Sequence, residues 1–181
     1  TRWHRTAIYR RRLPADAPPP SNVSLPIFRP PSARKRDEFR RGLWAFPGGR
    51  ISIEGSPFGV TPPNACWAES LHSLDWLTHF ARTDEPDAES DARSLVEQWL
   101  DLVDFETPHA FAPHVLGRRL MVLFAMRDEL ISRHRDEFAQ RLLASMAMQT
   151  KVLRDTIGYA TTGESQITAT LGLTMGELWL G

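Results

Sequence analysis

The sequence has little cysteine and little lysine, and it has no long apolar run. A single cysteine, Cys66, excludes an internal disulfide framework and fits a protein of a reducing compartment. No apolar stretch reaches the roughly 18 residues that a bilayer-spanning helix needs, so we expect no membrane partner. Only two of the 22 basic residues are lysine. The arginines that make up the rest suit bidentate contacts with phosphate groups.

A net charge of zero conceals a strong asymmetry along the chain. Residues 1–50 contain 12 basic and 3 acidic residues, a net charge of +9, whereas residues 51–181 contain 10 and 19, a net charge of −9. Charge asymmetry of this kind indicates a polyanionic partner. Phosphate contact is therefore the functional interpretation of the basic residues, and a solvated surface is the alternative.

The chain divides into residues 1–22, a basic and proline-rich extension, and residues 23–181, a single domain. The proline run at 18–20 cannot be helical and predicts an extended linker. A second basic stretch lies at 30–41, in a loop or a short helix. The predicted RNA-binding residues are the basic side chains of these two stretches: Arg10, Arg11, Arg12, Arg34, Lys35, Arg36, Arg40 and Arg41.

Hydrophobic periodicity predicts several secondary-structure elements. We expect a strand at 43–46, a helix that begins after Asn64 as its N-cap, and an amphipathic helix over 88–103. The continuous apolar run at 120–126 predicts a central strand, and spacings of three and four predict a helix over 129–153. The Thr- and Gly-rich stretch at 158–172 predicts turns or a last strand.

The stretch from Gly42 to Gly49, with its two adjacent glycines, reads as a strand that runs into a tight turn. Such glycines allow positive φ and close approach to a neighbouring element or a phosphate. This stretch resembles the start of a Nudix box, the signature of hydrolases that cleave diphosphates linked to another group. The resemblance implies an α/β fold, a Nudix-like α/β/α sandwich around a mixed sheet.

The acidic residues that should follow the Nudix glycine turn are mostly missing. Glu54 lies one position before the expected first glutamate, and a helix beginning near Asn64 keeps only Glu69. A rival register through Glu85 recovers Arg93 and Glu97 after a longer insertion. The chain contains no Glu-Glu dipeptide, so two carboxylates that would hold magnesium are absent. Glu54, Glu69 and Glu97 are therefore remnant catalytic candidates, and the six histidines show no zinc-site spacing.

The resemblance leaves three functions open. The favoured hypothesis is a non-enzymatic component of a ribonucleoprotein particle, similar to the degenerate Nudix-fold proteins of mitochondrial ribosomes. It implies a mitochondrial location, contacts with ribosomal RNA and neighbouring ribosomal proteins, and no cofactor or metal. The alternative is a magnesium-dependent Nudix hydrolase acting on coenzyme A or an RNA 5′ end. The third is a nucleotide-binding module with a pocket beside Gly48 and Gly49, lined by Arg50.

Overall fold

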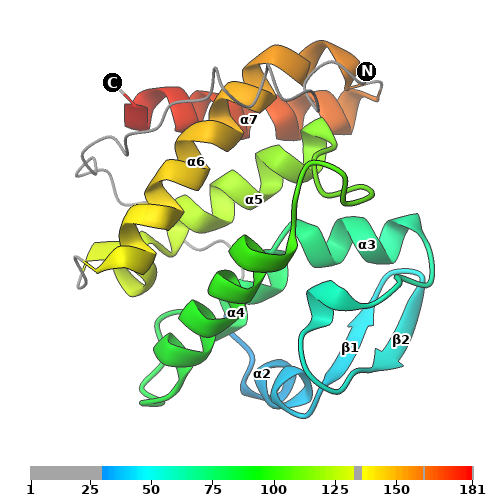
Figure 1. Ribbon diagram of the computed structural model, residues 1–181, viewed down its shortest axis with the longest axis vertical. Coiled ribbons are helices and arrows are strands. Elements are labelled where there is room, and N and C mark those ends of the chain that lie inside the picture. The colour runs from blue at the N-terminus through cyan, green and yellow to red at the C-terminus, as the bar shows by residue number, and fades with distance from the viewer. Residues whose placement is uncertain (1–29, 133–135, 161, 181) are drawn as a thin grey trace.

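The computed structural model describes residues 30–132, 136–160 and 162–180 (Figure 1). Helices predominate, and their connections include four short helical turns at 57–59 (η2), 75–80 (η3), 128–132 (η4) and 157–159 (η5). The main elements in chain order are α2 (Ala33–Arg40), β1 (Leu43–Phe46), β2 (Gly49–Ser52), α3 (Ala65–His72), α4 (Ala88–Leu102), α5 (Pro113–Ala125), α6 (Glu137–Thr156) and α7 (Gly163–Leu180).

The expected Nudix-like sandwich around a mixed sheet is wrong. In the described residues the sheet is a single antiparallel hairpin, in which β1 pairs with β2 from Leu43 opposite Ser52 to Phe46 opposite Gly49. The remaining core is built from packed helices, with α5 between α3, α6 and α7 (Figure 1). The chain is therefore a mainly helical protein that carries one small hairpin.

The glycine turn forms as expected, and the group that lies close to it is the side chain of Asn64. Gly48 has φ +93°, and a Cβ at this position would lie 2.3 Å from Oδ1 of Asn64. The Asn64 amide donates to the carbonyl oxygen of Gly48 at 2.6 Å, while its Oδ1 accepts from the backbone N–H of Trp67 at 3.0 Å. The predictions of a strand at 43–46 and of Asn64 as an N-cap are thus confirmed, and one side chain joins the turn to α3.

The prediction of an amphipathic helix at 88–103 is also confirmed, because α4 covers almost the same residues. Ala88, Ala92, Val96 and Trp99 are its buried residues, and their spacings of three and four place them on one face. Leu102, near the C-terminus of α4, is exposed. Periodicity alone was therefore sufficient for this element.

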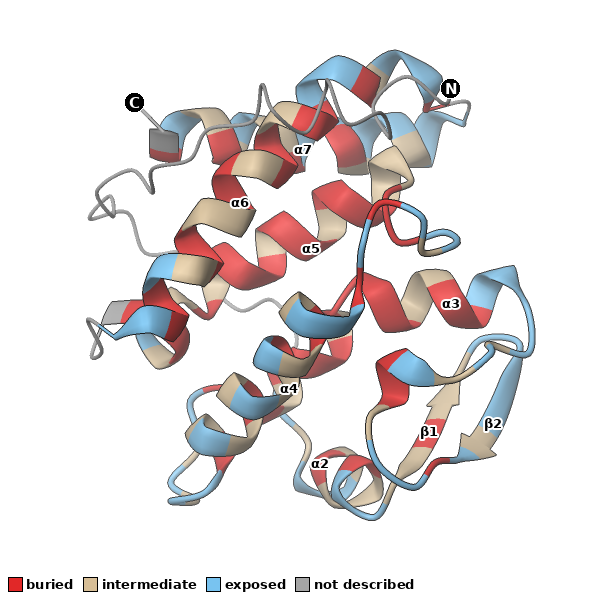
Figure 2. Ribbon diagram, in the orientation of Figure 1, coloured by how far each residue is buried: buried red, intermediate tan, exposed pale blue. Residues whose placement is uncertain are grey.

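The predicted strand at 120–126 is wrong, since these residues form the second half of α5 and its end. Leu116, Leu120 and Leu123 are completely buried, and Val122 and Phe124 are also inside (Figure 2). A helix covered on most sides gives the same continuous apolar run as a buried strand. The apolar run therefore predicted correctly that these residues are buried, but it predicted the wrong type of secondary structure.

Residues 158 and 159 of the stretch expected to contain turns or a last strand lie in the short helical turn η5, and from Gly163 on the stretch is instead the beginning of α7. One of its glycines, Gly172, allows α7 to cross α5 at very short range. A Cβ at Gly172 would lie 2.3 Å from Cα of Gly117, and a Cβ at Gly117 would lie 2.5 Å from the carbonyl oxygen of Thr168. These glycines serve helix packing, and not turns.

The predicted helix at 129–153 corresponds mostly to α6, which begins at Glu137 and continues to Thr156. Asp136 is its N-cap and accepts from the backbone N–H of Ala139 at 2.9 Å. The stretch at 30–41 contains the short helix α2, as one of the two alternatives for it predicted. The basic extension at 1–22 and the residues up to 29 lie outside the described residues. Within the described parts, no helix is both long and apolar enough to span a membrane.

Candidate functional site

A surface depression lies where α2 and the hairpin meet α4, and we call it the α2–α4 groove. Its volume is about 710 Å³. Fourteen residues line it: Phe39, Arg40, Arg41, Gly42, Trp44, Ile53, Gly55, Ser56, Pro57, Phe80, Asp91, Ser94, Leu95 and Gln98. Such a mixture of aromatic, apolar and a few polar groups in this size range is typical of binding sites.

An ion-pair network closes one side of the groove. Nη1 of Arg40 lies 2.9 Å from Glu85, and its Nη2 lies 2.6 Å from Asp91. Arg36, which is buried, also contacts Glu85 and donates to the carbonyl oxygen of His79 at 2.9 Å. Hydrogen bonds from Arg36 and Arg40 lower the pKa of Glu85, so this carboxylate is charged at neutral pH. The network fixes α2 to the loop before α4.

A second polar cluster lies on the far side of α3, where one carboxylate stands between two histidines. Oε1 of Glu69 is 3.6 Å from Nδ1 of His109, and Oε2 is 3.3 Å from Nε2 of His114. His109 has φ +64°, a left-handed conformation that is uncommon for a side chain of this kind. All three side chains reach solvent.

Arg119 is the most unusual charged residue of the described chain, because it is completely buried. Its Nη1 donates to the carbonyl oxygens of His72 at 2.7 Å and Ala110 at 2.9 Å, and its Nε donates to Oε1 of Gln149 at 2.6 Å. Burial lowers the pKa of Arg119 to about 9, so the guanidinium remains charged at neutral pH. A buried cation held by neutral oxygens joins α3, α5, α6 and the loop before α5.

The imidazole of His72 is buried beside this arginine. Burial, together with the positive charges of Arg119 and His109, lowers the pKa of His72 to about 3. The ring is therefore neutral at physiological pH. Its Nδ1 has no hydrogen-bond partner within the described residues.

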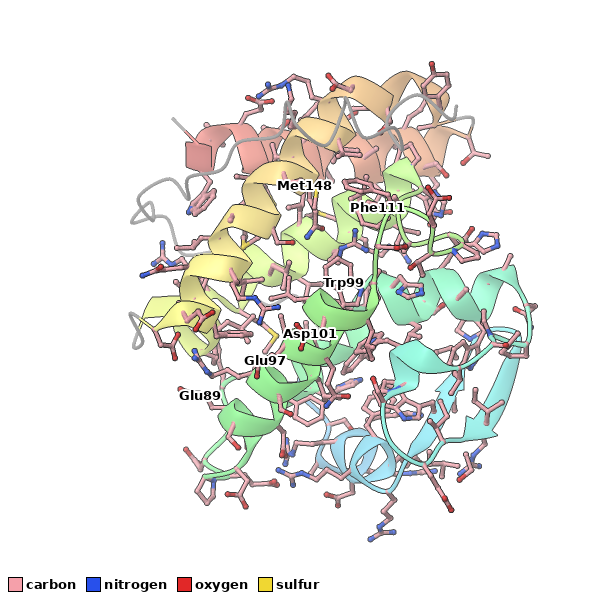
Figure 3. The ribbon with its side chains drawn as sticks, in the orientation of Figure 1. Glu89, Glu97, Trp99, Asp101, Phe111 and Met148 are labelled. Atoms are coloured by element: carbon pink, nitrogen blue, oxygen red, sulfur yellow. The ribbon has the colours of Figure 1, made fainter. Side chains whose placement is uncertain are left out.

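The three remnant catalytic glutamates lie on three different elements. Glu54 follows β2 and is exposed, Glu69 lies on α3 beside the two histidines, and Glu97 lies on α4, 3.7 Å from Nη1 of Arg141. Figure 3 shows Glu97 on the side of α4 that carries Glu89 and Asp101. No group of three or more His, Cys, Asp or Glu in the described ranges could hold a metal ion.

The predicted RNA-binding residues of α2 are mostly engaged within the protein. Arg34 and Lys35 contact Glu38 at 3.2 and 2.9 Å, and Arg36 and Arg40 belong to the network with Glu85. Arg41 is exposed, and its backbone N–H donates to the carbonyl oxygen of Asp37 at 3.1 Å. Arg10, Arg11 and Arg12 lie outside the described residues, and RNA binding by these eight residues stays a prediction.

Sequence reasoning did not identify Arg119 or the groove residues of α4. The guanidinium of Arg119 lies 4.4 Å from the ring centroid of Trp99 and 5.4 Å from that of Phe111. These rings lie together at the centre of the molecule (Figure 3). The paired arginines at 118 and 119, directly before the apolar run at 120–126, were the available signal. The proposed nucleotide pocket beside Gly48 and Gly49 does not coincide with the α2–α4 groove, which lies toward Gly42 and Gly55.

Comparison with known proteins gives one informative similarity. The chain is 27% identical over 149 residues to the FtsZ-localized protein C of Caulobacter vibrioides. The aligned region covers 81% of this chain and 26% of that relative, so the chain spans about a quarter of the relative's length. No family model and no solved structure matches the chain.

The mitochondrial location expected from the Nudix resemblance is wrong, because this relative is a bacterial protein. Because no family model matches the chain, the resemblance of the glycine turn to a Nudix box stays a prediction. The same holds for the ribosomal partners, the absence of a cofactor and the magnesium-dependent alternative.

Proposed function

We propose that this chain is a helical protein-binding module of a protein that localises with FtsZ. The observation that carries the proposal is the similarity to the FtsZ-localized protein C, which extends over most of this chain. The α2–α4 groove supports it as a surface depression of about 710 Å³ lined by both apolar and polar residues.

The first test is binding of the purified chain to immobilised FtsZ, with a fluorescent fusion of the chain imaged beside labelled FtsZ in Caulobacter cells. We expect saturable binding and a fluorescent signal that follows FtsZ when FtsZ is depleted and restored. A matched control is Gly172→Asp, which disrupts the contact between α7 and α5 and so tests whether binding requires the fold. Absence of binding together with a diffuse fusion signal would refute the proposal.

The charge asymmetry favours a second candidate function, contact with RNA in a ribonucleoprotein particle. Arg10 to Arg12 and Arg41 would then neutralise phosphates, and the affinity would decrease steeply with salt. Filter binding of a mixed RNA at several salt concentrations separates the two candidates. A flat salt dependence, unchanged when Arg10, Arg11 and Arg12 are replaced by glutamine, would exclude this second candidate.

A further inference from the structure

We propose that the outer face of α7 binds a second copy of this chain, so that two α7 helices pack antiparallel in a reversible dimer. The inference goes beyond the proposed function and does not depend on contact with FtsZ. α7 lies at one edge of the molecule, and exposed residues occur along it (Figures 1 and 2). Three of the large apolar side chains that are exposed in the described residues belong to this helix: Ile167, Leu171 and Leu178, with exposed fractions of 64%, 48% and 71%.

The inner face of α7 carries small residues, whereas its outer face carries large apolar ones. A Cβ added at Gly172 would meet α5, and one added at Gly176 would meet Thr150 of α6, so this side is already in close contact with the protein. Ala169 is buried on the same side. A surface helix normally presents polar residues to water, and a helix that is apolar all round is typical of a buried position. The composition of α7 is therefore that of a helix with packing partners on both faces.

The exposed residues of the outer face follow the spacing of a contact between two helices. Ile167, Leu171, Thr174 and Leu178 are all exposed, and they are separated by four, three and four residues. This is the spacing of the a and d positions in a coiled coil. At 1.5 Å per residue, the stripe extends over about 16 Å along the helix. The partner that fits it is a helix with an apolar stripe of the same length and spacing, and α7 of a second copy is such a helix.

The charge pattern of α7 also suits pairing with itself. No charged residue occurs from Ser165 to Gly176. The glutamates on either side are paired within the chain, since Glu164 lies 3.5 Å from Nη2 of Arg118 and Glu177 lies 2.6 Å from Nη2 of Arg154. An interface with two-fold symmetry joins the same patch of both copies, so a patch with several charges of one sign would repel itself. The outer face of α7 avoids this repulsion.

An antiparallel arrangement matches the most exposed side chains. With the two-fold axis halfway between Leu171 and Thr174, Ile167 of each copy lies opposite Leu178 of the other. A parallel arrangement would instead bring the two Glu164 side chains together. The apolar patch has an area on the order of 400 Å², and two such patches bury about 800 Å², which is less than a permanent complex requires. We therefore expect a weak dimer, with a Kd of about 100 µM.

The test is sedimentation equilibrium of the purified chain at concentrations from about 5 µM to about 500 µM, on both sides of the expected Kd. The average mass should rise with concentration from that of one chain toward that of two. Leu171→Glu places a carboxylate at the centre of the stripe and should weaken the association at least about tenfold, because each copy would bury an unpaired charge. Leu102→Glu is the matched control, since Leu102 lies on α4 and has a similar exposed fraction of 51%. It should leave the association unchanged.

A second pair of variants tests the same surface by a gain of association. Thr174→Leu completes the apolar stripe and should tighten the dimer severalfold, whereas Gln140→Leu adds a leucine at an exposed position of α6 and should not. Circular dichroism verifies that each variant is folded.

Salt separates an apolar contact from attraction between basic residues 1–50 of one copy and the acidic remainder of another. The α7 dimer should persist as sodium chloride is raised, because screening weakens contacts between exposed charges and leaves apolar burial intact. A single-chain mass at every concentration, equal effects of Leu171→Glu and Leu102→Glu, or a dimer that dissociates at high salt would each overturn the inference.

Discussion

The guanidinium of Arg119 lies 4.4 Å from the centroid of the Trp99 ring, and both side chains are buried. A cation over an indole face is attracted by the negative face of the ring, and the attraction increases when both groups are desolvated. Together with three hydrogen bonds to neutral oxygens, this contact compensates for the charge in the core. Hydrogen bonds thus join Arg119 to the elements around it in the core, where most residues hold their neighbours by apolar packing.

Replacement of Arg119 by methionine should lower the free energy of unfolding by about 3 kcal/mol, since three buried acceptors lose their donor. Urea denaturation measures the change. The control is Arg118→Met, whose exposed contacts with Asp75 and Glu164 should contribute less than about 0.5 kcal/mol. Equal effects of the two substitutions would contradict this role of Arg119.

The stability of the fold should fall as the pH decreases below 6.5. Burial lowers the pKa of His72 from 6.5 to about 3, so between these values the unfolded chain binds a proton that the folded chain does not. The stabilisation is complete above pH 6.5, and its loss at pH 4 is at most about 3 kcal/mol. Urea denaturation across this window should show the wild type losing stability relative to His72→Leu as the pH falls. Parallel curves would show that other groups cause the pH dependence.

Gly172→Ala should destabilise the protein, although alanine is the better helix former. The new methyl group would lie 2.3 Å from Cα of Gly117, and separating the two helices costs about 1–3 kcal/mol. Gly163→Ala is the control, because a Cβ at Gly163 has no neighbour within 4 Å. Thermal unfolding should therefore give a lower Tm for the first variant and an equal or higher Tm for the second.

Arg36→Met should reduce stability by about 1–3 kcal/mol, because the carbonyl oxygen of His79 loses its charged donor. Arg41→Met should change the stability by less than about 0.5 kcal/mol, as is usual for exposed residues. Chemical denaturation compares the two. A larger effect at Arg41 would mean that its side chain has a structural partner.

The sequence predicted the elements whose signals are local. Asn64 as an N-cap and the helix α4 depend on hydrogen bonds and spacings within a few residues, so they were predicted correctly. The run from Leu120 to Met126 was misassigned because only tertiary packing decides whether a continuous apolar stretch is a buried strand or a buried helix. Gly172 was assigned to turns or a last strand because the helix that it contacts, α5, is distant in sequence.

The site was less predictable than the fold. Glu69 was selected as a remnant magnesium ligand, yet its neighbours are His109 and His114, which no sequence spacing connects to it. The basic residues of α2 were read as an RNA surface, whereas Arg36 and Arg40 contact Glu85 from a distant part of the chain. Long-range ion pairs of this kind have no signature in a single sequence.

The single hairpin of this fold has a consequence for how the chain reaches its native state. Strand pairing joins Leu43 only to Ser52, so the sheet closes a short loop and needs no distant segment. The α5–α7 crossing joins Gly117 to Gly172 and must close a much longer loop. We therefore expect the hairpin to form early and the docking of α7 to complete folding, with α7 amides among the first to exchange when the native protein opens locally.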